Sequence, residues 1–176
     1  MSWRYILGVA GALVAFLGAS MLLPLPVSLY YADGAVLPMT LSAAVSILAG
    51  LAAYLLLRQP EQTGIGTREG MAIVAVGWTA VGLFGALPFW FSGTCSFIDA
   101  FFESVSGFTT TGASIFTDVE TVPEGILFWR SLIQWLGGMG IIVLSIAILP
   151  FLGVGGMQLY KAEVPSPVPD KLKPRI

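Results

Sequence analysis

The sequence has 176 residues, of which 56% are hydrophobic and only 10% are charged, and its formal net charge is −2. Because a soluble domain carries about 25% charged residues, this composition excludes an ordinary cytosolic globule, and the lack of any basic run argues against nucleic-acid binding. The sequence contains no histidine and a single cysteine, Cys95. Hydrolase, metalloenzyme and disulfide chemistry are therefore disfavoured.

Four uncharged stretches are long enough to cross a bilayer, which takes about 20 helical residues. We expect spans at residues 5–23, 39–57, within 70–98 (ending near Phe91), and 131–160 with a break at Pro150. Pro24 and Pro26 should end the first span. Its apolar part is too long for a signal peptide and no small-residue cleavage site follows, so we interpret it as a retained span.

The basic residues predict the orientation of these spans, because Lys and Arg favour the cytoplasmic side. With the N-terminus inside, seven of the eight basic residues lie inside: Arg4, Arg58, Arg68, Lys161, Lys171, Lys173 and Arg175. Arg130 then lies at the outer mouth of the last span. Tryptophans at Trp3, Trp90 and Trp129 fall near predicted span ends, where such side chains favour the membrane interface.

A short helix is predicted between the third and fourth spans. Ser96 and Asp99 form a helix-start signal, and the helix can last about eleven residues before Gly107, or roughly 16 Å. This length is about half of a hydrocarbon core of about 30 Å, so the helix either lies on the surface or enters and returns. Its apolar contacts are expected from Phe97, Ile98, Phe101, Phe102, Val105 and Phe108.

The residues that follow favour a re-entrant hairpin that binds a cation. The helix would direct its negative C-terminal end into the membrane, and an extended Thr-Thr-Gly stretch can present successive carbonyl oxygens to an ion. Gly112 would supply left-handed backbone angles at little steric cost, while the neighbouring threonine hydroxyls brace the strand. The pore-mouth charges Asp118, Glu120 and Glu124 would concentrate cations.

Each element also has a plainer interpretation. A Thr-rich stretch with a glycine is, taken alone, more often a surface turn. Asp99 and Glu103 lie four residues apart on one helical face and could bind protons or ions, but a helix cap and a solvated face are the expected roles. The run 137–140, Gly-Gly-Met-Gly, could be a hinge, although close helix packing is expected.

Residues 101–114 strongly resemble the first pore loop of the Trk/Ktr/HKT potassium-transporter superfamily. Residues 129–140 look like the helix that follows this loop, and the two spans before Gly70 are similar to the extra N-terminal pair of the TrkH branch. The resemblance implies that Gly112 is the single glycine of a selectivity filter. It also implies that carbonyls of Thr110, Thr111, Gly112 and Ala113 face a potassium ion.

The same resemblance carries expectations for the whole molecule. The family builds its pore from four span–loop–span repeats, and this sequence contains one, so we expect an N-terminal part that lacks three repeats. The expected parts are a helix pair at 1–69, the repeat at 70–160 and a cytoplasmic linker at 161–176. The resemblance also implies the bacterial inner membrane with both termini cytoplasmic, a TrkA-like nucleotide-binding regulatory subunit and a homodimer of full-length chains.

The sequence therefore predicts an all-α membrane protein with four transmembrane helices and one re-entrant half-helix. Its predicted function is potassium uptake without enzymatic chemistry or a cofactor, with the ion as the transported substrate. A non-transporting membrane scaffold or assembly subunit is the alternative, in which residues 109–114 form an outer turn. A third hypothesis, an intramembrane enzyme in which Asp99 and Glu103 share a proton, is weak because no histidine or nucleophile accompanies them.

Overall fold

A computed structural model describes residues 2–57 and 67–148, and all regular structure in these ranges is helical. The chain divides into two compact units, Met1–Gly140 and Ile141–Ile176. In the second unit the described part is the end of the last helix. The elements are α1 (Trp3–Ser20), α2 (Leu25–Tyr31), α3 (Val36–Leu57), α4 (Thr67–Gly85), α5 (Leu87–Phe91), α6 (Phe97–Phe108), the 3₁₀ turn η1 (Val119–Thr121) and α7 (Glu124–Ile148).

The first apolar segment is longer than predicted and is interrupted. Helix α1 ends at Ser20, and α2 begins directly after Pro24 with Pro26 in its first turn. Proline interrupts a helix interior but fits the first turn, where its missing N–H has no partner in any case. The prediction that these prolines end the first helix is correct, whereas α2 was not predicted.

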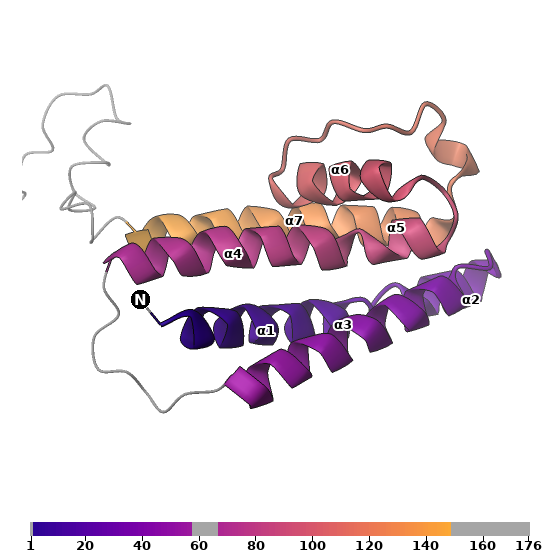
Figure 1. The fold of residues 1–176 in the computed structure, drawn as a ribbon. Helices are drawn as coiled ribbons and strands as arrows, with labels where there is room; N and C mark the ends of the chain where they lie inside the picture. The colour runs from indigo at the N-terminus through magenta and orange to yellow at the C-terminus, as the bar shows by residue number, and fades with distance from the viewer. Residues whose placement is uncertain (1, 58–66, 149–176) are drawn as a thin grey trace, which may run out of the picture. The chain divides into compact units, whose positions relative to one another are not determined.

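Helix α3 corresponds to the second predicted span and packs along α1 (Figure 1). Small residues allow the two backbones to approach closely. A Cβ atom added to Gly50 would lie 2.6 Å from the carbonyl oxygen of Gly11 and 2.8 Å from the Cα of Ala15. Packing of this kind holds helices together in lipid, where apolar contact alone does not favour association over contact with the acyl chains.

The third predicted span corresponds to α4 and α5, and the break at Ala86 allows Pro88 to occupy the first turn of α5. Within the described ranges, three helical segments are long and apolar enough to cross a membrane: Trp3–Tyr31, Val36–Leu57 and Arg68–Phe91. Helix α7 covers the start of the fourth predicted span. The remainder of that span, beyond residue 148, lies outside the described residues.

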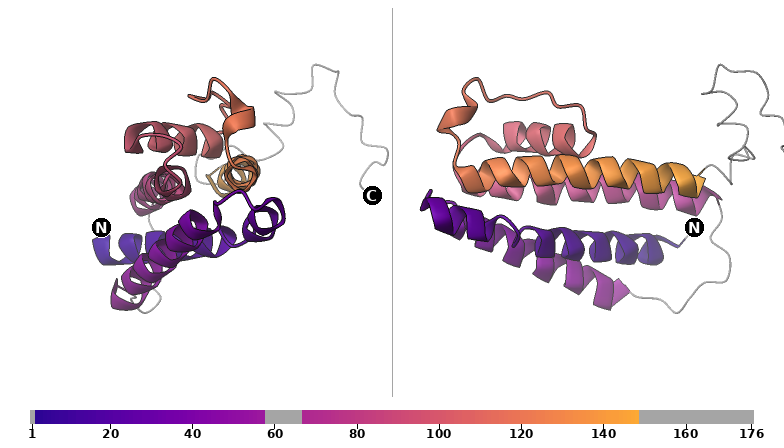
Figure 2. Two further views of the ribbon diagram at one scale, coloured as in Figure 1. Left: turned by 90° about the vertical axis from the view of Figure 1, so that its right-hand side faces the viewer. Right: turned by 180° about the vertical axis from the view of Figure 1, so that it is seen from behind.

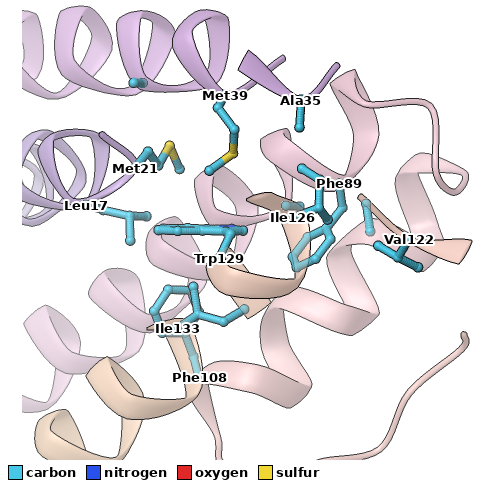
Figure 3. Close-up of a cluster of buried hydrophobic side chains, with 13 residues drawn as sticks. Leu17, Met21, Ala35, Met39, Phe89, Phe108, Val122, Ile126, Trp129 and Ile133 are labelled. Carbon is cyan, nitrogen blue, oxygen red and sulfur yellow. The ribbon is translucent and has the colours of Figure 1, made fainter. Parts of the chain in front are cut away.

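Trp129 of α7 lies in the hydrophobic core of the first unit, between Leu17 of α1, Met39 of α3 and Phe89 of α5 (Figure 3). Its indole N–H donates to the carbonyl oxygen of Gly85 at 3.0 Å, at the break between α4 and α5. The interfacial position predicted for Trp129 is therefore wrong, because the side chain is fully buried. By contrast, Trp3 and Trp90 are exposed.

Asp33, in the turn between α2 and α3, connects this turn to the start of α7. Its carboxylate accepts hydrogen bonds from the backbone N–H groups of Gly125 (2.7 Å) and Ala35 (2.9 Å) and from the Ser28 hydroxyl. Burial raises the pKa of this carboxyl group, but the hydrogen bonds from Ser28, Gly125 and Ala35 together outweigh burial and leave the pKa below its ordinary value. The N-terminal helices and α7 are thus joined by a carboxylate that is bonded in its charged form.

Helix α6 lies beside α4 and α7 and is much shorter than either (Figures 1 and 2). Its 12 residues extend about 18 Å at 1.5 Å per residue. The chain then returns to the end of the helices at which α6 began, through residues 109–118 and η1. We refer to residues 109–118 as the return segment, and to α6 with the return segment as the hairpin.

Candidate functional site

The hairpin begins with the predicted helix start. The hydroxyl of Ser96 accepts the backbone N–H of Asp99 at 3.3 Å and donates to its carboxylate at 2.7 Å. The observed α6 begins at Phe97 and ends one residue beyond Gly107, so the short helix predicted here is present. Asp99 has the predicted capping role.

The C-terminal end of α6 is closed by backbone hydrogen bonds in the pattern of a Schellman motif. The N–H of Thr110 donates to the carbonyl of Gly107 (2.9 Å), and that of Thr111 donates to the carbonyl of Ser106 (3.0 Å). The left-handed residue of this motif is usually glycine, but here it is Thr110, with φ of +56°. A β-branched residue in this conformation is strained, and such strain gathers at functional sites.

Gly112, the predicted filter glycine, has φ of +75°, so the left-handed conformation expected from the sequence is present. The hydroxyls of Thr109 and Thr111 lie 2.8 Å apart and brace this part of the return segment. Among the described residues, no hydrogen bond reaches the carbonyl oxygens of Thr110, Thr111 or Gly112, and residues 109–114 are exposed. Three successive carbonyl groups are therefore uncommitted.

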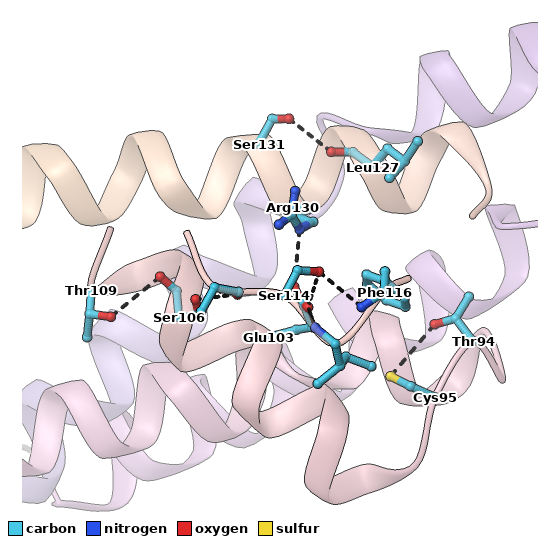
Figure 4. Close-up of polar contacts among 12 residues, drawn as sticks. Thr94, Cys95, Glu103, Ser106, Thr109, Ser114, Phe116, Leu127, Arg130 and Ser131 are labelled. Atoms are coloured by element: carbon cyan, nitrogen blue, oxygen red, sulfur yellow. Dashed lines mark hydrogen bonds and ion pairs between the residues drawn. The ribbon is translucent and has the colours of Figure 1, made fainter. Parts of the chain in front are cut away.

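Two side chains of α6 hold the return segment directly after Gly112 (Figure 4). The Ser106 hydroxyl donates to the carbonyl of Ala113 at 2.6 Å. One carboxylate oxygen of Glu103 accepts the Ser114 hydroxyl and the Ile115 N–H, each at 2.6 Å. One of the two lone pairs on the Ala113 carbonyl is thus directed to α6, which distinguishes it from the three carbonyls before it.

The solvated position expected for Glu103 is wrong. Its side chain is 1% exposed, and its second carboxylate oxygen accepts the Nε–H of Arg130 of α7 at 3.1 Å. One signal in the sequence could have indicated this ion pair: Glu103 lies in a short helix, and Arg130 is the one basic residue predicted on the outer side. Their separation of 27 residues hides the pairing from any local pattern.

The buried face of α6 differs in part from the prediction. Phe101 and Val105 pack against α4 as predicted, whereas Ile98 is 79% exposed, Phe102 is 46% exposed, and the fully buried residues are mainly small or polar. Among the predicted apolar contacts, only Phe108 is fully buried. The buried residues are Ala100, Glu103, Ser104, Ser106, Gly107 and Phe108.

Helix α7 receives the end of α6 at Gly137. A Cβ atom added here would overlap the carbonyl oxygen of Phe108 and lie 2.6 Å from its carbonyl carbon. The close packing predicted for residues 137–140 is therefore confirmed at Gly137. A small cavity between the hairpin and α7 is lined by Glu103, Gly112 and Arg130, among others.

The predicted mouth charges Asp118, Glu120 and Glu124 are all exposed. Asp118 also caps η1, since its carboxylate accepts the N–H of Glu120 at 3.0 Å. In the described part of the chain, no group of three or more His, Cys, Asp or Glu residues could hold a metal ion.

The described segment thus has the features of a membrane protein of the cation-transport class: long apolar helices and a short helix followed by a carbonyl-bearing return segment. Comparison with known proteins agrees. The family model TrkH, described as a cation transport protein, matches residues 38–175, and the chain belongs to this family. The computed structure is similar to the crystal structure of the potassium transporter TrkH from Vibrio parahaemolyticus, with a TM-score of 0.83 and 41% identity over 93% of this chain and 35% of that one.

Relatives by sequence agree with the structural match. The Trk system potassium uptake protein TrkH of Salmonella typhimurium is 48% identical over 179 residues, and that of Escherichia coli K12 is 47% identical. TrkG of Escherichia coli K12 is 37% identical over 178 residues. The alignments to the two TrkH proteins cover 100% of this chain but only 37% of each relative, so the chain spans little more than a third of their length.

Proposed function

We propose that this chain supplies the first pore-lining repeat, with its preceding helix pair, of a potassium uptake protein of the bacterial inner membrane. The observation that carries the proposal is the hairpin, in which Thr110, Thr111 and Gly112 present uncommitted carbonyls between two anchored ends. Carbonyl oxygens in such a row can replace the hydration shell of a cation. Ala113 completes the proposed filter with its second lone pair.

The proposed topology has four transmembrane segments, with the N-terminus in the cytoplasm and the hairpin entering from the outside. Its support is the distribution of basic residues together with the return of the chain to the end at which α6 begins. In this orientation Asp118, Glu120 and Glu124 lie at the outer mouth. The divisions at residues 69 and 160, the regulatory subunit and the homodimer belong to the same proposal.

Four hairpins arranged in a ring would be needed to surround an ion, since one hairpin supplies only a quarter of the coordination. The experiment therefore uses a chimera in which this chain replaces the aligned segment of TrkH from Vibrio parahaemolyticus. Uptake is measured in a bacterial strain that lacks potassium transport. We expect the chimera to restore uptake, and Gly112→Ser to reduce the preference for potassium over sodium by about 10-fold.

An unchanged preference in the Gly112→Ser chimera would contradict the filter assignment. Single cysteines placed at positions 101–114, in a Cys95→Ser background, separate the proposal from the scaffold alternative. Burial and, to a lesser degree, the nearby carboxylates of Asp99 and Glu103 raise the pKa of the native Cys95 thiol despite its hydrogen bond with Thr94. The hairpin predicts labelling that falls along α6 and recovers toward Ser114, whereas uniform labelling supports a surface turn.

A further inference from the structure

Two contacts from a single face of α6 determine where the proposed filter segment ends. Glu103 and Ser106 lie three residues apart, so they share a helical face. Their side chains bind the backbone at three successive positions: Ser106 at Ala113, and Glu103 at Ser114 and Ile115. These positions follow Gly112 directly. The segment with uncommitted carbonyls is therefore closed on its C-terminal side by side chains of α6.

The N-terminal side of the same segment is closed by the backbone of α6. The N–H groups of Thr110 and Thr111 donate to the carbonyls of Gly107 and Ser106. Because each N–H lies in one peptide plane with the carbonyl of the preceding residue, these bonds also fix the orientation of the Thr109 and Thr110 carbonyls. Thr110 is held in a strained left-handed conformation, which requires that both sides of the segment be firmly attached.

Glu103 is suited to this task because a carboxylate accepts several hydrogen bonds and donates none. Hydrogen bonds to a charged group are short and strong, as are the two 2.6 Å bonds to its first oxygen. A buried carboxylate without a counter-charge would be costly, and Arg130 supplies that charge from α7. Arg130 is itself 26% exposed, so it can hold Glu103 while remaining partly hydrated.

We propose that Glu103 is a positioning residue for ion selectivity, which orients the carbonyls of Thr110, Thr111 and Gly112 by holding Ser114 and Ile115. The inference rests on the proposed function of the hairpin. Arg130 acts through Glu103, because in the described structure its side chain donates to Glu103 and makes no hydrogen bond to the return segment. The selectivity of the hairpin thus depends on a hydrogen-bond acceptor behind the segment that would face the ion.

The test compares two substitutions of similar size in the Vibrio parahaemolyticus chimera. Glu103→Gln keeps a carbonyl acceptor for Ser114 and Ile115 but loses the ion pair with Arg130. Glu103→Met loses both. We expect Glu103→Met to reduce the preference for potassium over sodium by about 10-fold and Glu103→Gln to stay within about 3-fold of the parent, at equal amounts of protein in the membrane.

Asp99→Asn is the matched control, because Asp99 is the other carboxylate of α6 and its carboxylate is hydrogen-bonded to Ser96 at its own helix start and not to the return segment. Its preference should equal that of the parent. Parent-like preference in Glu103→Met, with reduced thermal stability, would overturn the inference and leave a purely structural ion pair. An equal loss in Glu103→Gln and Glu103→Met would also overturn it, because the ion pair and not the acceptor would then be responsible.

Ser114→Ala decides the question if Glu103→Met does not reach the membrane. This substitution removes one donor to Glu103 outside any helix, and we expect a loss of preference of about 3-fold. A preference for potassium over sodium equal to that of the parent would overturn the inference. Gly112→Ser is included in each series. If Gly112→Ser does not change the ion preference, the proposed filter is contradicted. If Gly112→Ser changes the preference but Glu103→Met and Ser114→Ala do not, only the proposed role of Glu103 is contradicted.

Discussion

The helix pair of α1 and α3 and the hairpin of α6 and the return segment are held together by different interactions. In the pair, the two backbones approach closely at Gly11 and Gly50, and α3 contains no charged residue. In the hairpin, a buried carboxylate, two serines and an arginine hold the chain. A helix satisfies its own backbone hydrogen bonds, whereas an extended segment cannot. The polar residues of α6 are those that the backbone of the return segment requires.

This comparison predicts that the two regions respond to different changes. The stability of the helix pair should fall when a side chain is enlarged, but not when a hydrogen-bond acceptor is removed. The hairpin should respond to both kinds of change, because its end also packs against α7.

The largest effect is expected for Gly137→Ala. The added methyl group would overlap the carbonyl of Phe108, so the end of α6 must move away from α7. We expect a loss of about 3 kcal/mol in stability and loss of uptake by the chimera, measured by thermal unfolding in detergent and by potassium uptake. Gly138→Ala is the control, because its methyl group would lie 3.7 Å from Thr110 in ordinary contact. Equal behaviour of the two variants would show that α6 does not pack here.

A smaller effect is expected for Gly50→Ala in the helix pair. The added methyl group would meet the backbones of Gly11 and Ala15, and we expect a loss of about 2 kcal/mol in stability. The preference for potassium should stay unchanged, since the pair lies outside the hairpin. Gly70→Ala, which has no neighbouring atom within 4 Å, serves as the control for thermal unfolding. A changed ion preference in Gly50→Ala would break the distinction between the two regions.

Thr110→Gly tests strain within the hairpin. A left-handed conformation costs a residue with a Cβ atom about 1–2 kcal/mol, part of which is offset by the greater freedom of glycine in the unfolded chain. We expect a gain in stability of about 0.5–1 kcal/mol, seen as a higher unfolding temperature. Thr109→Gly is the contrasting variant. Thr109 has φ of −81°, which causes no such strain, so the same change should lower the stability of the protein. A lower unfolding temperature for Thr110→Gly would show that its side-chain contacts outweigh the strain.

The smallest effect concerns Asp33, which links the two regions through α7. Because its pKa in the folded protein is lower than the ordinary 3.8, the charged carboxylate contributes stability above that pH, and the contribution is lost as the pH falls through the folded-state pKa. Asp33→Asn should therefore unfold at a lower temperature than the parent at pH 7. The unfolding temperatures of the variant and the parent should become equal as the pH falls below about 4. A difference that stays constant with pH would show that charge is not involved.

The ends of α6 and the conformation of Gly112 were predictable because their signals are local. Ser96 and Asp99 lie three residues apart, and Gly112 is the residue type that adopts a left-handed conformation without strain. The left-handed Thr110 was not predicted, since no property of threonine favours it. Only the hydrogen bonds on both sides of Thr110 explain its conformation.

The burial of Glu103 and Trp129 was missed for a different reason. Both depend on partners far along the chain, at Arg130 and Gly85, which periodicity does not reveal. The buried face of α6 was misassigned in part, because the prediction treated its apolar face as its buried face, as in a soluble helix. In a protein surrounded by lipid, apolar side chains such as Ile98 and Phe102 are equally stable on the outside. The filter carbonyls and mouth charges remain predictions.

The composition of the buried face of α6 also constrains the order of assembly in the membrane. A helix of 12 residues with a glutamate and two serines on one side is too short and too polar to enter lipid as an independent span. It needs both Arg130 and Gly137 as a docking surface, and these residues are synthesised after it. The docked arrangement of the hairpin therefore depends on a helix that follows it in the chain.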